Sequence, residues 1–279
     1  MTRSTSVILD HKHYDKPSVF VPEHLLREAR RQNAIPPGRV PRICVLDPDG
    51  DIVCHVIARN EARLSSSWAC YHTHLYQVEH AGIDFGIIAC AVGAPFAVLV
   101  AEELFASGCE LLISVTSSGL IRSDAEPPFF MLIERALRDE GTSYHYLPPS
   151  DYAYIDDRLL SAFEGVVAEV GVPVGRGSTW TTDAPFRETR AAIDYAASEG
   201  IVAVEMEAAA LYAFARAREK PVICFAHVTN RMGRVEKDFE KGDQAGSDDA
   251  LRLIVATANA WLTRRPRTGE KFRCFSSTA

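Results

Sequence analysis

The chain has 279 residues, of which 47% are hydrophobic and 24% are charged, and its formal net charge is −7. This is an ordinary globular composition, and the length suits one large α/β domain. The acidic balance argues against a nucleic-acid partner, which normally needs a basic patch. We interpret the basic run at 264–267 as part of a solvated tail.

No apolar stretch approaches the length of a membrane span, and the apolar run at the N-terminus is too short for a signal peptide. The seven cysteines are scattered and form no Cys-x-x-Cys pair, which favours a reducing compartment. We therefore expect a cytoplasmic protein that has no membrane partner. His72 and His74 have no third ligand near them in sequence, so no metal site is predicted.

Residues 1–40 are polar and proline-rich, and we expect an N-terminal extension with a helix at 22–32, where Pro22 takes the first turn. From residue 41 to 265 short β-branched runs alternate with helical stretches, which predicts a largely parallel sheet covered by helices. The expected strands are 43–46, 52–57, 85–92, 111–116, 172–180, 201–204 and 222–228. The expected helices are 95–106, 157–170, 186–198, 207–219 and 248–262. Residues 128–146 fit either a strand or a helix start, and 266–279 form a tail.

Two glycine-containing turns follow predicted strands and can present backbone N–H groups to an anion. The first is Gly93-Ala-Pro95, for which an ordinary exit from a strand is an equally good interpretation. The second contains Thr116, Ser117, Ser118 and Gly119. Three hydroxyl groups before a glycine at a strand end are unusual, and no hydrophobic core requires them.

Acidic residues cluster between 180 and 210. Asp183 follows one predicted strand, and Glu205, Met206 and Glu207 follow the next. Because ligands of alternating α/β chains bind at the carboxyl edge of the sheet, these side chains are expected to converge on one small molecule. Taken singly, Asp183 also fits a turn or N-cap, and Glu207 fits an acid at a helix N-terminus. The switch from strand to helix leaves the direction of Glu205 open.

Residues 42–262 resemble the nucleoside phosphorylase superfamily. The residues that carry the resemblance are Gly93-Ala-Pro95 with Ala101-Glu-Glu-Leu104, the strand and loop 112–119, Trp180-Thr-Thr-Asp-Ala-Pro-Phe-Arg-Glu-Thr189, and Val204-Glu-Met-Glu-Ala-Ala-Ala-Leu211. The resemblance implies a single-domain, three-layer α/β/α sandwich around a mixed, partly barrel-like sheet. It also implies cleavage of a nucleoside N-glycosidic bond without a cofactor, with inorganic phosphate as co-substrate, in a homodimer or homohexamer.

The resemblance further implies roles for individual residues. Glu207 binds the ribose hydroxyls, Met206 packs on the sugar, and the loop 116–119 holds phosphate. Asp183 helps the base to leave, which suits an acid whose pKa is raised by burial, because the departing base needs a proton or a hydrogen bond. Residues proposed for the base side are Arg187, Tyr144 and Phe225. Whether the base is a purine or a pyrimidine stays open.

The chain departs from the family pattern where phosphate is expected to bind. The first loop reads Asp47-Pro-Asp-Gly-Asp51, with acids and no arginine, and Ser114 occupies a position that is usually arginine. Either Arg59 or Arg63 supplies the charge, across a subunit interface if necessary, or water is the nucleophile and Asp47 or Asp49 activates it. Phosphorolysis is the preferred interpretation. The alternatives are a hydrolytic nucleosidase and a nucleoside-binding protein without activity. The polar stretch 231–246 is either a lid or a solvated loop.

Overall fold

The computed structural model describes residues 7–122, 125–167, 170–232, 236, 238–239 and 241–264. The tail 266–279, including Cys274, and most of the basic run at 264–267 lie outside the described residues. Ten strands belong to one sheet. They are β1 (Ile43–Asp47), β2 (Ala62–Leu64), β3 (Tyr76–His80), β4 (Ile83–Ala89), β5 (Leu111–Leu120), β6 (Phe129–Asp139), β7 (Tyr152–Tyr154), β8 (Val174–Thr182), β9 (Ala203–Glu205) and β10 (Val222–Asn230).

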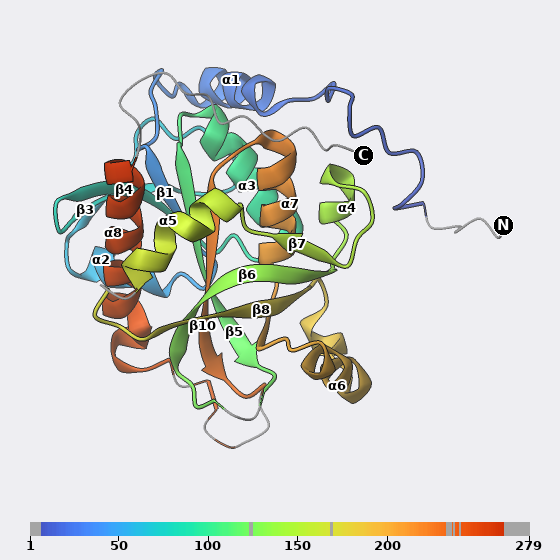
Figure 1. Cartoon of the computed structure of the whole chain (residues 1–279). Helices are drawn as coiled ribbons and strands as arrows, with labels where there is room; N and C mark the ends of the chain where they lie inside the picture. The colour runs from blue at the N-terminus through green and yellow to red at the C-terminus, as the bar shows by residue number, and fades with distance from the viewer. Residues whose placement is uncertain are drawn as a thin grey trace.

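The α-helices alternate with these strands (Figure 1). They are α1 (Pro22–Asn33), α2 (Asp51–Ala58), α3 (Ala94–Ala106), α4 (Ser143–Tyr146), α5 (Asp157–Val167), α6 (Arg190–Ser198), α7 (Ala208–Arg218) and α8 (Ser247–Arg264). Short 3₁₀ turns, η1 (Pro185–Arg187) and η2 (Asp243–Gly246), precede α6 and α8.

Part of the sheet closes on itself. The strand order is β10-β6-β8-β9-β5-β1-β4-β3-β2, and β10 also pairs with β5. Strands β5, β10, β6, β8 and β9 therefore form a closed barrel, from which β1, β4, β3 and β2 extend as an open sheet. Pairing is mixed: β10 runs parallel to β5 but antiparallel to β6. This arrangement matches the predicted mixed, partly barrel-like sheet.

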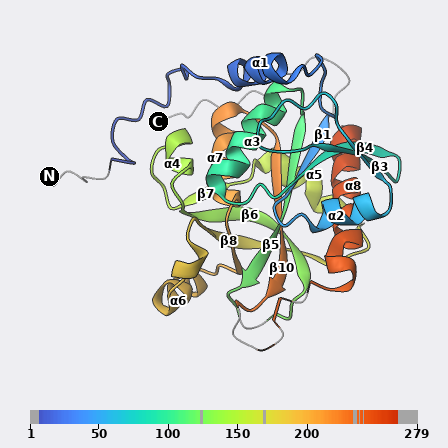
Figure 2. The same cartoon turned by 180° about the vertical axis from the view of Figure 1, so that it is seen from behind.

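The helices cover the sheet from two sides, which gives the three layers that were expected. Helices α3, α4 and α7 pack together, and α1 lies on α3. Helix α8 packs on α2 and α5 at the other side (Figure 2). The buried phenol of Tyr212 ties α7 to the barrel, because it donates to the Ile133 carbonyl of β6 and accepts from the Cys224 N–H of β10.

The expected strand at 52–57 is wrong, because this segment is helix α2. Its β-branched residues favoured a strand, but Ile52, Val53 and Val56 lie on one buried helical face. The preceding loop decides the outcome: Gly50 adopts φ +82°, and the Asp47 carboxylate accepts the N–H groups of Gly50 and Val53. These contacts turn the chain sharply after β1 and start the helix.

The remaining strand and helix predictions agree with the structure in type, with shifts at the ends. The undecided segment 128–146 forms strand β6 followed by the short helix α4. Three strands were not expected at all: β2, β3 and β7. Each lies outside the barrel and is only partly buried, so the apolar periodicity that signals a strand is weak there.

Candidate active site

The buried carboxylate of Glu207 contacts two segments that are distant from it in sequence. This residue lies between β9 and α7, opposite Thr116 of β5, and is 1% exposed. The Gly93 N–H at the start of α3 donates to its Oε1 over 2.7 Å, and the Thr116 hydroxyl donates to its Oε2 over 2.9 Å. Gly93 has φ +88°, a backbone conformation that favours glycine, and this aims its N–H at the carboxylate.

Glu205 has a structural role. Its carboxylate accepts from the hydroxyls of Thr179 and Thr181 and from the backbone N–H groups of Glu207 and Ala208, over 2.5–3.1 Å. It therefore caps the first turn of α7, the role that sequence reasoning had considered for Glu207. With four donors around it, Glu205 is committed to positioning Glu207 rather than to contacting a ligand.

The two glutamates share one buried, electrostatically coupled environment. Burial raises the pKa of Glu207 to about 8, and the charge of Glu205 adds to the effect. Burial also raises the pKa of Glu205, against the action of its hydrogen-bond donors. A hydroxyl that donates to Glu207 favours the ionised form, so this carboxylate is prepared for additional donors. Met206, between them, is half-buried.

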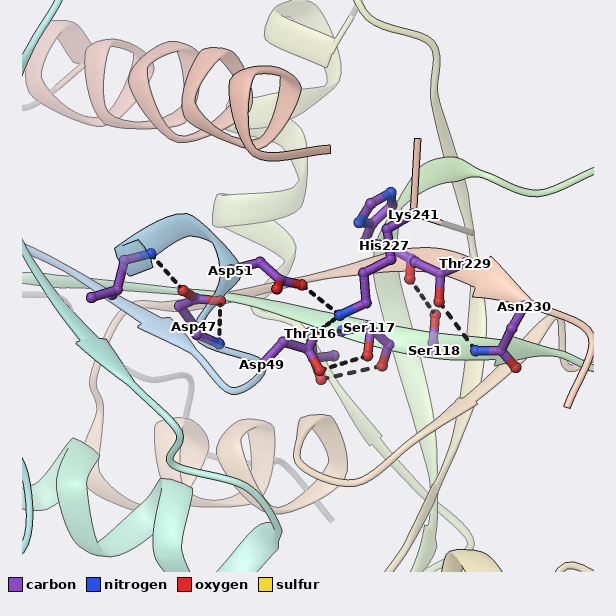
Figure 3. Close-up of polar contacts among 12 residues, drawn as sticks. Asp47, Asp49, Asp51, Thr116, Ser117, Ser118, His227, Thr229, Asn230 and Lys241 are labelled. Carbon is purple, nitrogen blue, oxygen red and sulfur yellow. Dashed lines mark hydrogen bonds and ion pairs between the residues drawn. The ribbon is translucent and has the colours of Figure 1, made fainter. Parts of the chain in front are cut away.

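The hydroxyl-rich segment Thr116–Gly119 was expected to be a loop, but it is the last part of strand β5, because it continues the pairing with β10. Its Ser117 contacts the acidic loop after β1 (Figure 3). Asp49 Oδ1 accepts from the Ser117 hydroxyl over 2.8 Å, and Asp49 Oδ2 accepts from the Ser117 N–H over 2.9 Å. Lys241, which lies 190 positions from Asp51, places its Nζ 2.5 Å from Asp51 Oδ2 and 3.6 Å from Asp49 Oδ2. Sequence reasoning missed this lysine, because the stretch 231–246 offered no motif beyond its polarity.

Asp47 and Asp49 have different environments. Asp47 is 2% exposed, and its carboxylate is used by the backbone of α2. Burial raises the pKa of Asp47 to about 7, and the Val53 N–H acts in the opposite direction. Asp47 and Asp49 were both proposed to activate water. Asp47 instead starts helix α2, and of the two only Asp49 contacts the hydroxyl-rich segment.

Two further residues, His227 and Asn230, lie on strand β10 beside the hydroxyl-rich segment. His227 of β10 stacks on Phe130 with ring centroids 4.3 Å apart, and burial lowers its pKa to about 4, so the ring is neutral. Asn230 ends β10 and accepts the Met232 N–H over 2.8 Å. A Cβ on Gly119 would lie 3.3 Å from the Asn230 side-chain oxygen, so Gly119 permits this close approach. The Ser118 hydroxyl donates to the His227 carbonyl.

Asp183 lies at the end of β8, where Thr181 pairs with Glu205 of β9. It is exposed, not buried as its proposed role had suggested, and its carboxylate accepts the Gly141 N–H over 2.8 Å. It lines a hollow of about 520 Å³ together with Pro95 and other residues of α3, α4 and the N-terminal segment. Pro95 follows Gly93 by two positions, so this hollow begins at the helix N-terminus that contacts Glu207.

The residues proposed for the base side do not lie together. Arg187 is exposed on η1. Tyr144 donates its hydroxyl to the Arg138 carbonyl and stacks under the Arg138 guanidinium, 4.3 Å away. Phe225 is fully buried in the hydrophobic core, where its ring has no surface free for a base. Phe225 was proposed to line the base, but packing in the hydrophobic core accounts for it.

The arginines considered for phosphate have partners of their own. Arg59 pairs with Glu61 at 2.7 Å and with Asp248 at 3.2 Å. Arg63 lies on the end strand β2 and donates to Gln77. Ser114, where an arginine was expected, is buried, and its hydroxyl has no hydrogen-bond partner among the described residues.

Within the described part of the chain no group of three or more His, Cys, Asp or Glu residues could hold a metal ion, and no helix could span a membrane.

Comparison with curated proteins gives enzymes of one kind. The chain is 27% identical over 229 residues to a guanosine phosphorylase of Halorubrum lacusprofundi, covering 80% of this chain and 89% of that protein. It is 26% identical over 257 residues to a uridine phosphorylase of Thermococcus kodakarensis, covering 85% of this chain and 90% of that protein.

Solved structures share the fold. A uridine phosphorylase from Vibrio fischeri ES114 superposes with a TM-score of 0.66 at 19% identity, covering 84% of this chain and 94% of that one. A purine nucleoside phosphorylase from Toxoplasma gondii, solved in complex with immucillin-H, gives a TM-score of 0.67 at 16% identity and covers 81% and 92% of the two chains. Residues 42–259 match the family described as the phosphorylase superfamily, and this chain belongs to that superfamily.

Proposed function

We propose that this protein cleaves the N-glycosidic bond of a nucleoside by phosphorolysis, releasing the free base and ribose 1-phosphate. The observation that carries the proposal is the hydrogen bond between Thr116 and Glu207. It joins the buried acid that is proposed to bind the sugar to the first residue of the hydroxyl-rich segment that is proposed to bind phosphate. Both lie at the edge of the sheet where α/β folds bind ligands. Family membership and the names of the relatives support the same reaction.

In this reaction a phosphate oxygen forms a bond to the anomeric carbon while the carbon–nitrogen bond breaks and its electron pair leaves with the base. Positive charge develops on the sugar and negative charge on the base. Glu207 accepts hydrogen bonds from the ribose hydroxyls. It uses the carboxylate lone pairs that are not bound by the Gly93 N–H or the Thr116 hydroxyl, and Met206 lies beside the sugar. The segment proposed to bind phosphate also contains Ser117, Ser118 and Gly119.

Asp183 is the proposed partner of the departing base. Its position at the end of β8, next to the strand that leads to Glu207, supports this role. Its exposure means that a bound nucleoside, or a neighbouring subunit, must cover it before it can act as a proton donor in a dry site. Arg187, on the same connection, is the remaining base-side candidate.

The functional unit is proposed to be residues 41–265 assembled as a homodimer or homohexamer. Arg63, which lies on β2 at one end of the sheet, is the residue proposed to reach a neighbouring copy. The six cysteines in the described part of the chain are unpaired, which supports the expected reducing, cytoplasmic compartment. Inorganic phosphate is the only co-substrate proposed.

Hydrolysis by the same residues is the competing function, and the contact of Asp49 with Ser117 is the observation that favours it. Incubation with a panel of purine and pyrimidine nucleosides, with and without phosphate, separates the two. We expect base release that depends on phosphate. Equal release of the base without phosphate would establish a nucleosidase. If no nucleoside releases its base, the remaining interpretation is a nucleoside-binding protein without activity.

A further inference from the structure

The segment proposed to bind phosphate, Thr116–Gly119 of β5, already binds an oxyanion of the chain itself, the Asp49 carboxylate. Both carboxylate oxygens of Asp49 are bound by Ser117, one through the hydroxyl at 2.8 Å and the other through the backbone N–H at 2.9 Å. A hydroxyl and an N–H of one residue that point the same way are donors that an anion can use. A phosphate presents its oxygens to such a pair as a carboxylate does.

Lys241 supplies positive charge at the same point. Its Nζ contacts Asp51 and lies 3.6 Å from the Asp49 oxygen that accepts the Ser117 N–H. The side chains of Lys241 and Asp49 are 25% and 31% exposed, so a small anion can reach them from solvent. His227 lies near Lys241 (Figure 3). Burial lowers the pKa of His227 to about 4, so its ring adds no charge.

Phosphate and Asp49 cannot share this position. With Asp49 in place, two carboxylates face one lysine, and a phosphate dianion would be repelled. When Asp49 rotates into solvent, the hydroxyl and the N–H of Ser117 become free to bind phosphate. Lys241 then has one neighbouring carboxylate, that of Asp51, in place of two. The loop backbone need not move, because Asp47 fixes the N–H groups of Gly50 and Val53.

We propose that Asp49 is an internal competitor of phosphate for Ser117, and that Lys241 is the phosphate-binding cation of this chain in place of the missing arginines. This proposal rests on the proposed function, since it identifies how the same reaction obtains its phosphate. It makes phosphate affinity a balance between Asp49 and the incoming anion, and the exchange involves no covalent step.

The test is calorimetric titration of the full chain with inorganic phosphate. Asp49→Ala is expected to bind phosphate about tenfold more tightly than the wild type, because the competitor is gone. Lys241→Met is expected to bind about tenfold more weakly. Asp51→Ala is the matched control: it removes the same charge beside the same lysine but not a Ser117 partner, so a change of about threefold or less is expected. Asp49→Asn, which keeps the size of the side chain, replaces Asp49→Ala if that variant does not fold.

The results separate this proposal from the proposed function. If Asp49→Ala binds phosphate no more tightly than the wild type, or no more tightly than Asp51→Ala, the competition is wrong. Unchanged binding in Lys241→Met would remove the lysine from the site. If binding changes as expected but no nucleoside releases its base, the exchange stands and the proposed phosphorolysis fails. If the wild type releases base without phosphate and Asp49→Ala does not, Asp49 activates water and the competition is overturned.

Discussion

The proposed sugar side and the proposed nucleophile side of this site use the same type of residue in opposite ways. Glu207 and Glu205 are buried, and each accepts hydrogen bonds from fixed backbone and threonine donors. Asp49 and Asp51 are partly exposed and share a lysine. The carboxylates are therefore held by fixed donors on one side and are partly exposed to solvent on the other, which suits the proposed binding of a nucleoside and the proposed entry of phosphate.

The largest expected effect tests the fixed side. Glu207→Gln keeps the size of the side chain but removes the charge that strengthens the bonds to two ribose hydroxyls. We expect kcat/KM to fall by about 10³-fold, from about 2 kcal/mol for each charged hydrogen bond. Steady-state kinetics with saturating phosphate measures this. Glu79→Gln, on an exposed position of β3, is the control that should retain full activity. A loss below about tenfold would mean that Glu207 does not bind the sugar.

The second prediction concerns the leaving base. Asp183→Ala should lower kcat by roughly 10²-fold while changing nucleoside affinity much less, because proton donation matters in the transition state. Asp194→Ala removes a similarly exposed carboxylate from α6 and should have no such effect. Wild-type turnover in Asp183→Ala would assign the leaving group to another residue at this edge, with Asn230 as the first to test by Asn230→Ala.

The third prediction tests whether Glu205 is structural. The Thr181 hydroxyl donates to Glu205 and accepts the Ala209 N–H of α7 over 2.9 Å. Thr181→Val should lower the free energy of unfolding by about 1–3 kcal/mol, since buried polar groups lose their partner. Thermal unfolding measures this, against the exposed Thr263→Val, for which we expect about 0.5 kcal/mol or less. Equal stability of the two variants would contradict the capping role.

The smallest effect is a pH dependence that belongs to the buried side alone. Because burial raises the pKa of Glu207 from 4.5 to about 8, its ionisation disfavours the folded state. The stability linked to this group is complete below the unfolded pKa and is lost as the pH rises through the folded pKa. Relative to Glu207→Gln, the wild type should lose about 1 kcal/mol between pH 5 and pH 6 in denaturant unfolding. A constant difference between the two proteins across this range would contradict the raised pKa.

The same comparison explains what could be predicted from the sequence. The block from Trp180 to Ala210 is local and specific, so the sugar side and the barrel-like fold followed from the resemblance. The different contacts of Glu205, which caps α7, and Glu207 could not be predicted in this way, because they depend on where β9 ends and α7 begins. The helical state of 52–57 was missed for a similar reason: side-chain contacts of Asp47 outweigh the strand preference of Ile52 and Val53.

The nucleophile side depends on contacts between distant segments, which a sequence pattern does not show. Asp49 and Ser117 are 68 positions apart, and Lys241 lies 190 positions from Asp51. The acids of the first loop were noticed as a departure from the family. Only the fold places Asp49 on the donors of Ser117 and places Lys241 beside both Asp49 and Asp51.

The sugar product tests the central claim most directly. The purified chain is incubated with its best nucleoside and inorganic phosphate in ¹⁸O-labelled water, and the products are followed by ³¹P NMR and mass spectrometry. Phosphorolysis predicts ribose 1-phosphate in equal amount to the released base, with no ¹⁸O in the sugar. Free ribose that carries ¹⁸O, without a ribose 1-phosphate signal, would contradict the account and identify water as the nucleophile.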